Sequence, residues 1–406
     1  MKVLIVSQYF WPENFRINDL AAGLVERGHE VTVLTGIPNY PQEEFFPGYG
    51  CFKKTREEYK GVRILRVPLL PRGNGSGLRL ALNYLSFALS ACLLAPFLCR
   101  GKFDLIFVCQ LSPVTVGLPA LLLKKLKKVP ILFWILDLWP ESLAATGAIR
   151  SPKLLALVER LVRFTYHGCD KIVVASKGFL SSVTAKGFAL ERTDYFPNWY
   201  EPEYRSQTEA EGTTPLPSGF RVMFAGNIGV AQDFGNILAA AERLKSYPDI
   251  HWLILGDGRQ CEWVKEQVQR RGLADKVHLL GRHAPKAMSG YFTQADAMLV
   301  TLKRDPAFAL TIPGKIQSYM ACARPIIAAL DGEGGRLIVE SGAGFSSPAE
   351  DAEALAASVL TMYRLPKEVR ETMGQRGKKF CEENFEREML LDRLEGWMFE
   401  ISSRNH

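Results

Sequence analysis

Apolar runs alternate with amphipathic segments along the first half of the chain. Residues 2–7 form a continuous apolar run, as expected for a parallel strand that is covered on both faces. In residues 17–25 apolar side chains recur at helical spacing, and Gly28 is placed to end that helix. A further helix is predicted at 151–169, with Pro152 near its start. The same pattern predicts more strands at residues 30–35, 103–109, 130–136 and 170–176.

The second half repeats this alternation after a polar connector. Residues 198–219 are rich in Pro, Gly and Thr, which is the composition expected between two domains. Alternating strands and helices at this spacing indicate doubly wound α/β layers. We therefore predict two Rossmann-like domains that face each other across a cleft, at 1–202 and 220–385, with a linker at 203–219. The strands predicted in the second domain are 220–226, 251–256, 276–281, 296–302 and 324–330.

Glycine-rich loops follow strands in the second half but not in the first. The loop after residues 2–7 reads "QYFWPENFR", which is too bulky for the close backbone approach that a dinucleotide pyrophosphate needs. An NAD enzyme is therefore disfavoured. In the second half, "FAGNIG" and "LGDG" both follow strands, where ligands bind in open α/β sheets. A single loop of this kind can be a tight turn, but several in one domain favour a nucleotide site.

Composition and charge narrow the class of partner. The net charge of +7 over 406 residues permits anionic partners such as sugar nucleotides or phospholipid head groups, and we expect no nucleic acid. The 8 cysteines contain no C-x-x-C pair, and most lie in apolar runs, as expected for free thiols in a reducing cytosol. The 6 histidines form no H-x-x-x-H pattern, so we expect no metal site.

One uncharged segment complicates a purely soluble interpretation. Residues 80–99, between Arg79 and Arg100, are long and apolar enough to cross a bilayer as a helix. The alternative is a helix that packs against a parallel sheet, interrupted by Asn83, Ser86 and other polar or kinking residues. Because the segment lies inside a strand–helix pattern whose later strands need the same compartment, we favour burial or partial membrane contact. The amino-terminal apolar run is predicted as a first strand and not as a signal peptide.

Several motifs together resemble the retaining GT-B glycosyltransferases of family 4. They are "GLVERGHEVTVLT", "FPNWYEP", "FAGNIG", "LGDG", "LLGRHAPKAMSGYFTQADAMLV" and "KIQSYMACARPIIA". Their order covers nearly the whole chain. The segments "YFWPE", "RINDLA", "GIPNYP" and "DLWPES" resemble most closely the bacterial branch of L-fucosamine and fucosyl transferases of O-antigen, capsule and colanic acid assembly.

This resemblance implies a reaction, two substrates and a terminal helix. The second domain would hold a nucleotide-diphosphate sugar, linked to UDP or GDP, and the first would bind a saccharide carried on a polyprenyl diphosphate. Transfer would retain the anomeric configuration without a metal or another cofactor, because amides and cations neutralise the leaving diphosphate. The protein would act at the cytoplasmic face of the inner membrane, bound peripherally to its anionic surface. Residues 386–406 resemble the terminal helix that returns to the first domain.

The chain departs from the family pattern at several donor positions. Two glutamates of many family members fall on Leu310 and Ser318 here, and an arginine position falls on Asn227. Lys315, in "PGK" at a predicted helix start, is then the strongest remaining cation, and we predict that it contacts the diphosphate. Gly281 and Arg282 follow a strand where the family holds the base. The predicted donor-binding residues are Gly226, Asn227, Gly229, Gly281, Arg282, Gly314, Lys315 and Ser318.

The first domain offers candidates for catalysis and acceptor binding. Asp137 closes an apolar strand, where a carboxylate is costly to bury without a purpose, and Glu141 follows it. We predict catalytic roles for Asp137 and Glu141; the alternative for Asp137 is a helix N-cap. Glu13, Asn14 and Arg16 replace a glycine pair of the family and are predicted to contact the acceptor or a donor phosphate, or else to be ordinary loop residues.

Two other functions share this architecture. A sugar-nucleotide 2-epimerase would need carboxylates and histidines at the cleft for proton abstraction, and this chain places few histidines at strand ends. A non-catalytic GT-B protein that only binds sugar nucleotides is the second alternative, in view of the missing glutamates. Donor hydrolysis and release of nucleoside diphosphate distinguish a transferase from both.

Overall fold

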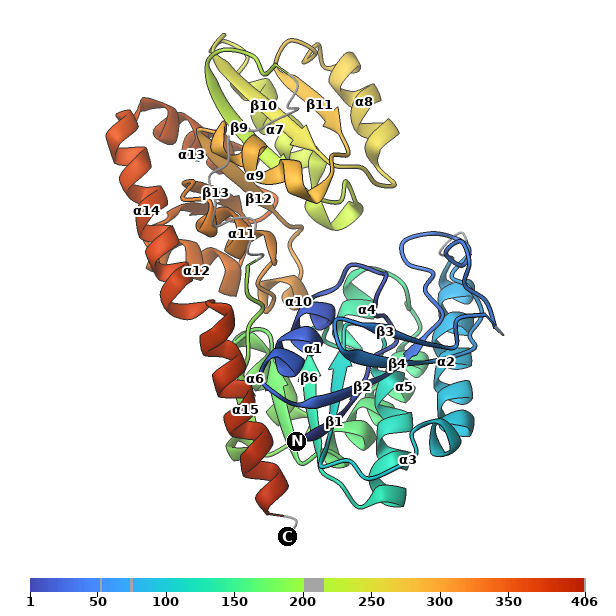
Figure 1. The fold of residues 1–406 in the computed structure, drawn as a ribbon. Coiled ribbons are helices and arrows are strands. Elements are labelled where there is room, and N and C mark those ends of the chain that lie inside the picture. Colours follow the sequence, from blue (N-terminus) through green and yellow to red (C-terminus); the bar gives the residue numbers. More distant parts are fainter. Residues whose placement is uncertain (52, 74–75, 201–214, 405–406) are drawn as a thin grey trace. The chain divides into compact units, whose positions relative to one another are not determined.

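The structure is a computed structural model that describes residues 1–51, 53–73, 76–200 and 215–404. The chain divides into two compact units, Met1–Pro197 with Glu388–His406, and Asn198–Arg387. Each unit is a layered α/β domain with its own sheet (Figure 1). Most of the predicted linker at 203–219 lies outside the described residues.

The sheet of the first unit has 8 strands in the order β3-β4-β2-β1-β5-β6-β7-β8. All neighbouring pairs are parallel except β3 with β4. Every residue of β5, β6 and β7 is buried, which explains their continuous apolar sequence. The strands are β1 (Lys2–Val6), β2 (Glu30–Gly36), β3 (Arg56–Tyr59), β4 (Val62–Val67), β5 (Leu105–Gln110), β6 (Ile131–Ile135), β7 (Lys171–Val174) and β8 (Thr193–Tyr195).

Our sequence analysis did not identify the antiparallel pair β3–β4. Its turn is the dipeptide Lys60–Gly61, and both residues have positive φ, 48° and 78°. Two-residue turns of this kind connect antiparallel strands because their twist matches that of the strands. The Lys-Gly dipeptide between two short strand-like segments was the local signal for this hairpin.

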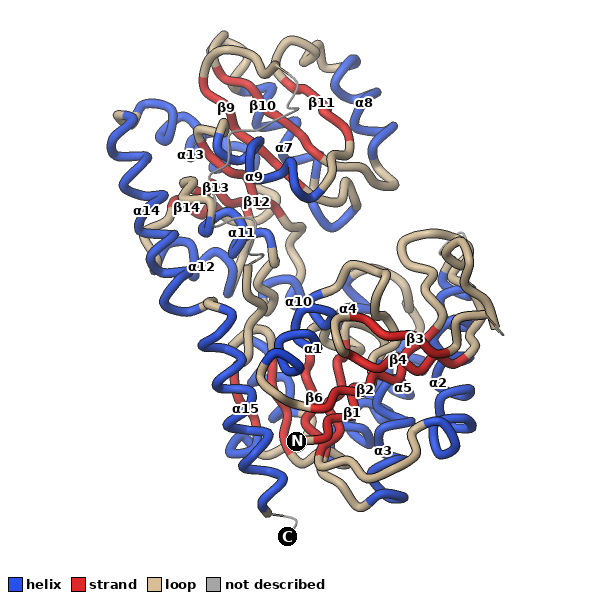
Figure 2. The backbone as a smooth tube through the Cα atoms, viewed as in Figure 1, coloured by secondary structure: helices blue, strands red, loops and turns tan. Residues whose placement is uncertain are grey.

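Helices cover both faces of the first sheet. Helices α2, α3 and α5 lie on one face, and α1 and α15 lie on the other (Figures 1 and 2). The predicted stop at Gly28 is confirmed, since α1 ends just before it and Gly28 has a φ of 83°. The helices of this unit are α1 (Arg16–Glu26), α2 (Gly77–Leu98), α3 (Gly117–Lys127), α4 (Glu141–Ala145), α5 (Pro152–His167), α6 (Gly178–Ala185) and α15 (Arg387–Ser403).

The terminal helix α15 belongs to the first unit. Arg27, after α1, bonds the carboxylates of Glu388, Asp392 and Glu395 on α15. His29 Nε2 lies 2.6 Å from Glu395 Oε1. Trp397 packs edge-on against Phe196 with 5.8 Å between ring centroids. These contacts connect the last segment of the chain to the first Rossmann-like layer.

The second unit has a parallel sheet of 6 strands in the order β11-β10-β9-β12-β13-β14. Its strands are β9 (Phe220–Ala225), β10 (Ile250–Leu255), β11 (Val277–Gly281), β12 (Ala297–Thr301), β13 (Ile326–Ala329) and β14 (Gly344–Ser347). Its helices are α7 (Phe234–Arg243), α8 (Cys261–Arg270), α9 (Pro285–Thr293), α10 (Pro306–Ala309), α11 (Lys315–Ala321), α12 (Glu333–Glu340), α13 (Ala352–Arg364) and α14 (Lys367–Asn384). The reversal of strand order between β9 and β12 is the topological switch point where ligands bind in such sheets.

Candidate functional site

The loops after β9, β10 and β11 are joined by backbone hydrogen bonds at their glycines. Gly226 N–H donates to Leu255 O, and Gly256 N–H donates to Gly281 O. A Cβ on Gly256 would lie 1.9 Å from Gly226 O, so only glycine fits there. Gly226 itself has a φ of 138°. The predicted residues Gly226 and Gly281 are therefore brought together with Gly256 at one edge of the sheet.

Asn227 and Gly229 lie in the same loop system. Ile228 N–H donates to Asp257 O at 2.8 Å, which holds the loop after β9 against the loop after β10. A Cβ on Gly258 would come within 2.7 Å of Asn227 Oδ1, and one on Gly229 within 2.5 Å of Asn227 Nδ2. The glycines thus leave the space that the Asn227 amide occupies.

Lys315 reaches the glycine loop from the start of α11. A Cβ added to Gly226 would lie 3.3 Å from Lys315 Nζ, so the lysine occupies the space beside this glycine. Lys315 Nζ donates to Gln232 Oε1 at 2.9 Å and lies 3.9 Å from the centroid of the Phe224 ring. The two groups that we expected to contact the diphosphate, the glycine loop and Lys315, are adjacent in the structure.

Tyr319 determines this adjacency. Its hydroxyl accepts from Ala225 N–H at 2.9 Å and donates to Ala225 O at 3.1 Å. The Tyr319 side chain is buried, and its two hydrogen bonds to the end of β9 hold α11 against the glycine loop. Sequence analysis missed both Tyr319 and Gln232 as site residues. An aromatic residue one turn after Lys315 has no local signal for such a contact, because its partner lies in a strand far away in the sequence.

The electrostatic state of Lys315 is unusual. Burial lowers its pKa to about 7, from an ordinary value of 10.5. The lysine has the face of Phe224 and one amide oxygen in place of a hydration shell. An anion that arrived beside Gly226 would stabilise the charged form of the lysine, so the arrangement is suited to bind a diphosphate.

The remaining predicted donor residues lie around this centre. Gly314 immediately precedes Lys315, and Ser318 lies on the next turn of α11. Arg282 is exposed directly after Gly281. A shallow depression of about 440 Å³ lies over the ends of β13 and β14 and is lined by Asp331, Gly332 and Arg336, among others. A Cβ on Gly334, at the start of α12, would lie 3.2 Å from Pro313, so α12 packs closely on the segment that leads to Lys315.

In the first unit, Asp137 lies beyond the end of β6. Its Oδ2 accepts from the indole Nε1 of Trp139 at 3.0 Å, and the side chains of Ser112 and Ser142 also hydrogen-bond to it. Burial raises the pKa of its carboxyl group above the usual range, and these bonds oppose that rise. Helix α4 begins at Glu141, and within the described residues no side chain caps it. Asp137 therefore does not serve as the helix N-cap that we had considered as its alternative role.

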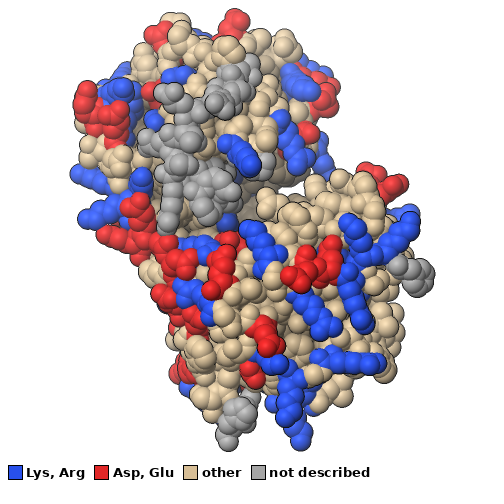
Figure 3. Space-filling model, viewed as in Figure 1, with Lys and Arg blue, Asp and Glu red and all other residues tan. Residues whose placement is uncertain are grey.

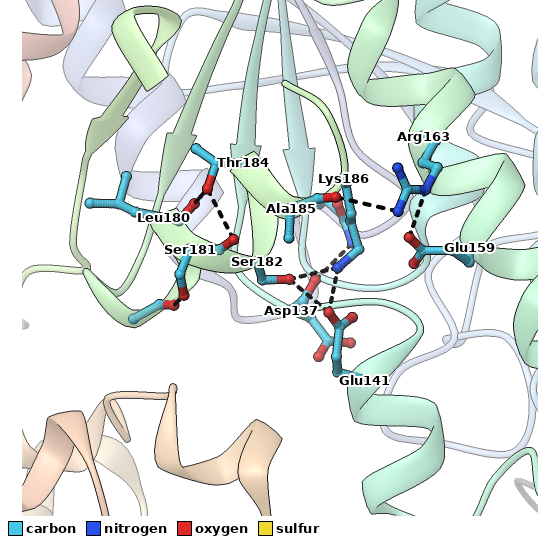
Figure 4. A network of polar contacts seen from close by, with 12 residues as sticks. Asp137, Glu141, Glu159, Arg163, Leu180, Ser181, Ser182, Thr184, Ala185 and Lys186 are labelled. Atoms are coloured by element: carbon cyan, nitrogen blue, oxygen red, sulfur yellow. Dashed lines mark hydrogen bonds and ion pairs between the residues drawn. The ribbon is translucent and has the colours of Figure 1, made fainter. Parts of the chain in front are cut away.

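Glu141 is engaged in a different contact. Its Oε1 accepts from Ser182 Oγ at 2.7 Å and from Lys186 Nζ (Figure 4). Lys186 is buried, so its ammonium group depends on this carboxylate for charge compensation. Glu141 thus connects α4 to α6, and its catalytic role stays a prediction.

Glu13 is also committed to a local contact. Only 2% of the residue is exposed, and its carboxylate accepts from the backbone N–H groups of Phe10 (3.2 Å), Asn39 (2.8 Å) and Tyr40 (2.7 Å). Burial raises the pKa of Glu13 to about 7 in spite of these bonds. Asn14, next to it, is exposed, and Arg16 is half-buried at the start of α1. Of these three acceptor candidates, Glu13 holds the backbone of its own loop in place through its carboxylate.

A cluster of aromatic side chains around Arg72 was not predicted from sequence. Arg72 Nη1 donates to Tyr9 OH at 2.5 Å, and the guanidinium lies 5.0 Å from the centroid of the Tyr40 ring. Tyr84 on α2 also hydrogen-bonds to both Tyr9 and Arg72. Its ring lies 5.9 Å from that of Trp139, the partner of Asp137. These residues form a continuous wall from the loop after β1 to Asp137.

Among the described residues, no group of three or more His, Cys, Asp or Glu side chains is placed to hold a metal ion.

Comparisons with known proteins agree with both units. Residues 14–199 match the glycosyl transferase 4-like domain, and residues 219–364 match glycosyl transferases group 1. The chain is 26% identical over 385 residues to the "Putative colanic acid biosynthesis glycosyl transferase WcaI" of Escherichia coli K12, covering 90% of this chain and 93% of that protein.

Solved structures with this arrangement of elements are numerous. HepE of Anabaena in complex with UDP superposes with a TM-score of 0.72 at 15% identity, over 98% of this chain and 100% of that one. Sucrose-phosphate synthase of Thermosynechococcus elongatus also has a TM-score of 0.72 at 15% identity, over 99% of each chain. These likenesses show the fold. The chain therefore carries, in the GT-B fold, the glycosyl transferase 4-like domain and the group 1 domain of a glycosyltransferase.

Proposed function

We propose that this protein is a retaining glycosyltransferase of surface polysaccharide biosynthesis. It transfers a sugar, such as N-acetyl-L-fucosamine or another deoxy sugar, from a UDP- or GDP-linked donor to a saccharide on a polyprenyl diphosphate. The similarity to WcaI supports the pathway class, and the UDP bound by the HepE structure supports a nucleoside diphosphate as ligand. The sequence motifs and their order along the chain both support family 4.

The desolvated Lys315 beside the glycine loop is the observation that carries this proposal. Donor cleavage breaks the bond between the anomeric carbon and the diphosphate oxygen, and negative charge then builds up on that leaving oxygen. The ammonium of Lys315, 3.9 Å from the Phe224 centroid, is held where water competes little for such a charge. Gly226 and Gly256 allow the loops after β9 and β10 to pack closely together beside Lys315. Asn227, Gly229 and Ser318 would contact the donor nearby, and Gly281 with Arg282 would hold the base.

Asp137 is the proposed polar partner of the reacting sugars. It would accept a hydrogen bond from the donor sugar or take the proton of the acceptor hydroxyl. Its raised pKa suits proton transfer near neutral pH better than that of an ordinary aspartate. The acceptor would be bound by Asn14 and Arg16, on the loop that Glu13 holds in place, and its diphosphate would meet Arg72. We expect no metal requirement, because Lys315 and backbone amides can neutralise the leaving group.

The test begins with the purified protein and a panel of UDP- and GDP-sugars. A bound donor should raise the apparent melting temperature by mass action. The best donor is then incubated with a synthetic polyprenyl-diphosphate saccharide, with and without EDTA, and the anomeric configuration of the product is determined by NMR. A retained configuration and equal rates in EDTA are expected. Epimerised donor without acceptor would support the 2-epimerase, and binding with no turnover would support the non-catalytic protein.

A further inference from the structure

Helix α2 presents a long apolar stripe to solvent. The residues of this stripe recur every three or four positions along its outer side and are between 40% and 73% exposed: Leu78, Leu82, Leu85, Leu89, Leu93 and Phe97. Helix α2 is 22 residues long, which corresponds to about 33 Å. A stripe of leucines on one side of a long helix is larger than the scattered apolar residues that ordinary soluble surfaces expose.

Neighbouring helices on the same face of the sheet extend this apolar surface. Helix α2 packs on α3, and α3 packs on α5. Leu126 on α3 is 58% exposed, and Leu157 and Phe164 on α5 are 61% and 60% exposed. We define the outer face of α2, α3 and α5 as the apolar face of the first unit.

The inner side of α2 is bound to the domain by polar contacts. Asn83 is fully buried, accepts from Gln8 Nε2 at 2.7 Å and donates to Leu70 O at 2.6 Å. Ser86 Oγ accepts from Leu70 N–H, and Ser90 Oγ donates to Pro68 O. By length and composition α2 is the one helix among the described residues that could cross a membrane. A bilayer span would break all of these bonds and expose Asn83 to lipid, which is costly.

Cations surround the apolar face, and few carboxylates do. Exposed basic residues flank α2 and lie on α3 and α5: Arg79, Arg100, Lys102, Lys125, Lys128, Lys153 and Arg160. Helices α2 and α3 contain no acidic residue, and the one on α5, Glu159, is paired with Arg163. Figure 3 shows Lys and Arg side chains around the part of the surface where Figure 1 places α2 and α3.

From these observations we propose that the apolar face docks on the surface of an anionic lipid bilayer. The leucines of α2 enter the boundary of head groups and acyl chains, and the flanking lysines and arginines contact the acidic head groups. In a symmetric dimer through this face, the same cations would oppose each other, so their charge favours an anionic surface over a second copy. The protein thus lies on the membrane without crossing it.

The position of α2 connects this surface to the proposed function. Asn83, in the second turn of α2, contacts Gln8 just beyond the end of β1. The amino-terminal turns of α2 therefore lie at the same sheet edge as Arg72 and Asp137. Insofar as the acceptor is lipid-linked, which rests on the proposed function, a docked first unit would meet the head group of that lipid at this edge.

Cosedimentation with lipid vesicles tests the proposal on the full-length protein. One set of vesicles contains phosphatidylglycerol with phosphatidylethanolamine, the other phosphatidylcholine alone, and neither contains an acceptor or a donor. The wild-type protein should pellet with the anionic vesicles, at least about tenfold more tightly than with the neutral ones, and should be released by high salt. Replacement of the exposed stripe should weaken binding at least about tenfold: Leu85→Gln, Leu89→Gln and Leu93→Gln together.

Two further variants make the test specific. The matched control replaces exposed apolar residues elsewhere and should bind like the wild type: Leu190→Gln, Val339→Gln and Val369→Gln. A charge variant, Lys125→Gln with Lys128→Gln, should weaken binding roughly tenfold. Lys124 is kept, because it donates to Gly168 O and to Asp170 and so supports the fold. Circular dichroism and the melting temperature confirm that each variant is folded.

Four results would overturn the proposal. They are a wild type that never pellets with anionic vesicles, a stripe variant that pellets like the wild type, a protein released only by detergent, and a stripe variant that dissociates a dimer in the absence of lipid. Donor binding is measured on the same preparations without vesicles. Intact donor binding with failed docking removes only this inference, whereas failed donor binding with intact docking removes only the proposed function.

Discussion

Each unit has one ionisable side chain of shifted pKa close to the loop that follows the first strand of its sheet: Glu13 in the loop after β1, and Lys315 at the start of α11, beside the loop after β9. The polar groups of these two side chains are satisfied differently. Glu13 in the first unit accepts from three backbone N–H groups. Lys315 in the second unit contacts one amide oxygen and the face of Phe224. Burial brings the pKa of each to about 7, by raising that of the carboxyl group and lowering that of the ammonium group.

This difference indicates a structural role for Glu13 and a ligand-binding role for Lys315. The oxygens of Glu13 already have partners, and 2% exposure leaves little room for a ligand. Lys315 has donor capacity left and lies beside Gly226, which has no side chain. A buried charged group whose hydrogen bonds are all made within the protein holds a loop in place. One that has hydrogen-bonding capacity left can bind an ion of opposite sign. This comparison supports the proposals that Lys315 binds the diphosphate and that Asp137 acts on the reacting sugars.

The largest effect is expected for Asp137→Asn. If Asp137 accepts a proton or orients the reacting sugar, turnover should fall roughly 10²–10⁴-fold while the donor Kd stays within about twofold. The measurement is kcat together with the donor Kd of the same preparation. Glu159→Gln is the matched control: it removes only the partly exposed ion pair with Arg163 on α5, so turnover and donor Kd should both stay near those of the wild type. Full activity of Asp137→Asn would contradict the assignment.

The next largest effect is expected for Lys315, the proposed ligand of the diphosphate. Lys315→Met removes a charge-assisted contact worth roughly 1.5–3 kcal/mol, so nucleoside-diphosphate affinity should fall roughly 10- to 150-fold in calorimetry. The same change removes a buried charge and should raise the free energy of unfolding at pH 7 by roughly 1–3 kcal/mol. Lys265→Met, on the exposed face of α8, should change neither quantity. Unchanged affinity in Lys315→Met would show that the diphosphate binds elsewhere.

A smaller effect follows from the pKa of Lys315. Binding of a nucleotide sugar needs the protonated lysine, and in the free protein that proton is lost around pH 7. Affinity should therefore fall as pH rises from 7 to 9, by up to about tenfold per unit. Lys315→Arg keeps its charge throughout this range and should bind with a flatter pH dependence. An equally steep decline in the arginine variant would assign the proton to another group.

The smallest effect is expected for Glu13, whose carboxylate binds the backbone of its own loop. Because the pKa of Glu13 is raised from 4.5 to about 7, the folded state holds this proton more tightly than the unfolded state. The contribution of Glu13 to stability is thus complete below pH 4.5 and is lost as pH rises to about 7, by roughly 2–3 kcal/mol. Glu13→Gln lacks this loss, so the stability of the wild type relative to the variant should decline over that window in urea denaturation. Donor affinity should not change, and a pH-independent difference would refute the buried titration.

The layers of this fold follow from local sequence. Continuous apolar runs such as residues 103–109 and 130–136 became the buried strands β5 and β6, because a parallel strand covered on both faces needs apolar side chains at every position. Gly28 follows the end of α1 because glycine readily adopts the positive φ found there. The glycine loops and Lys315 could be singled out in the same way. The β3–β4 hairpin was missed because β3 is short and half-exposed.

Only the tertiary structure decided which of these residues meet and which are free. The sequence of α2 is apolar on nearly every side, and packing alone determined that Asn83 faces inward while Leu85 and Leu89 face outward. Glu13 was predicted to contact the acceptor and Glu141 to act in catalysis, but the sequence could not show that distant backbone amides bind the carboxylate of Glu13 or that Lys186 contacts Oε1 of Glu141. Tyr319 positions Lys315 through a strand about 90 residues away in the chain. Charge and hydrophobicity are properties of single residues, but whether a polar group is satisfied depends on partners that only folding brings within reach.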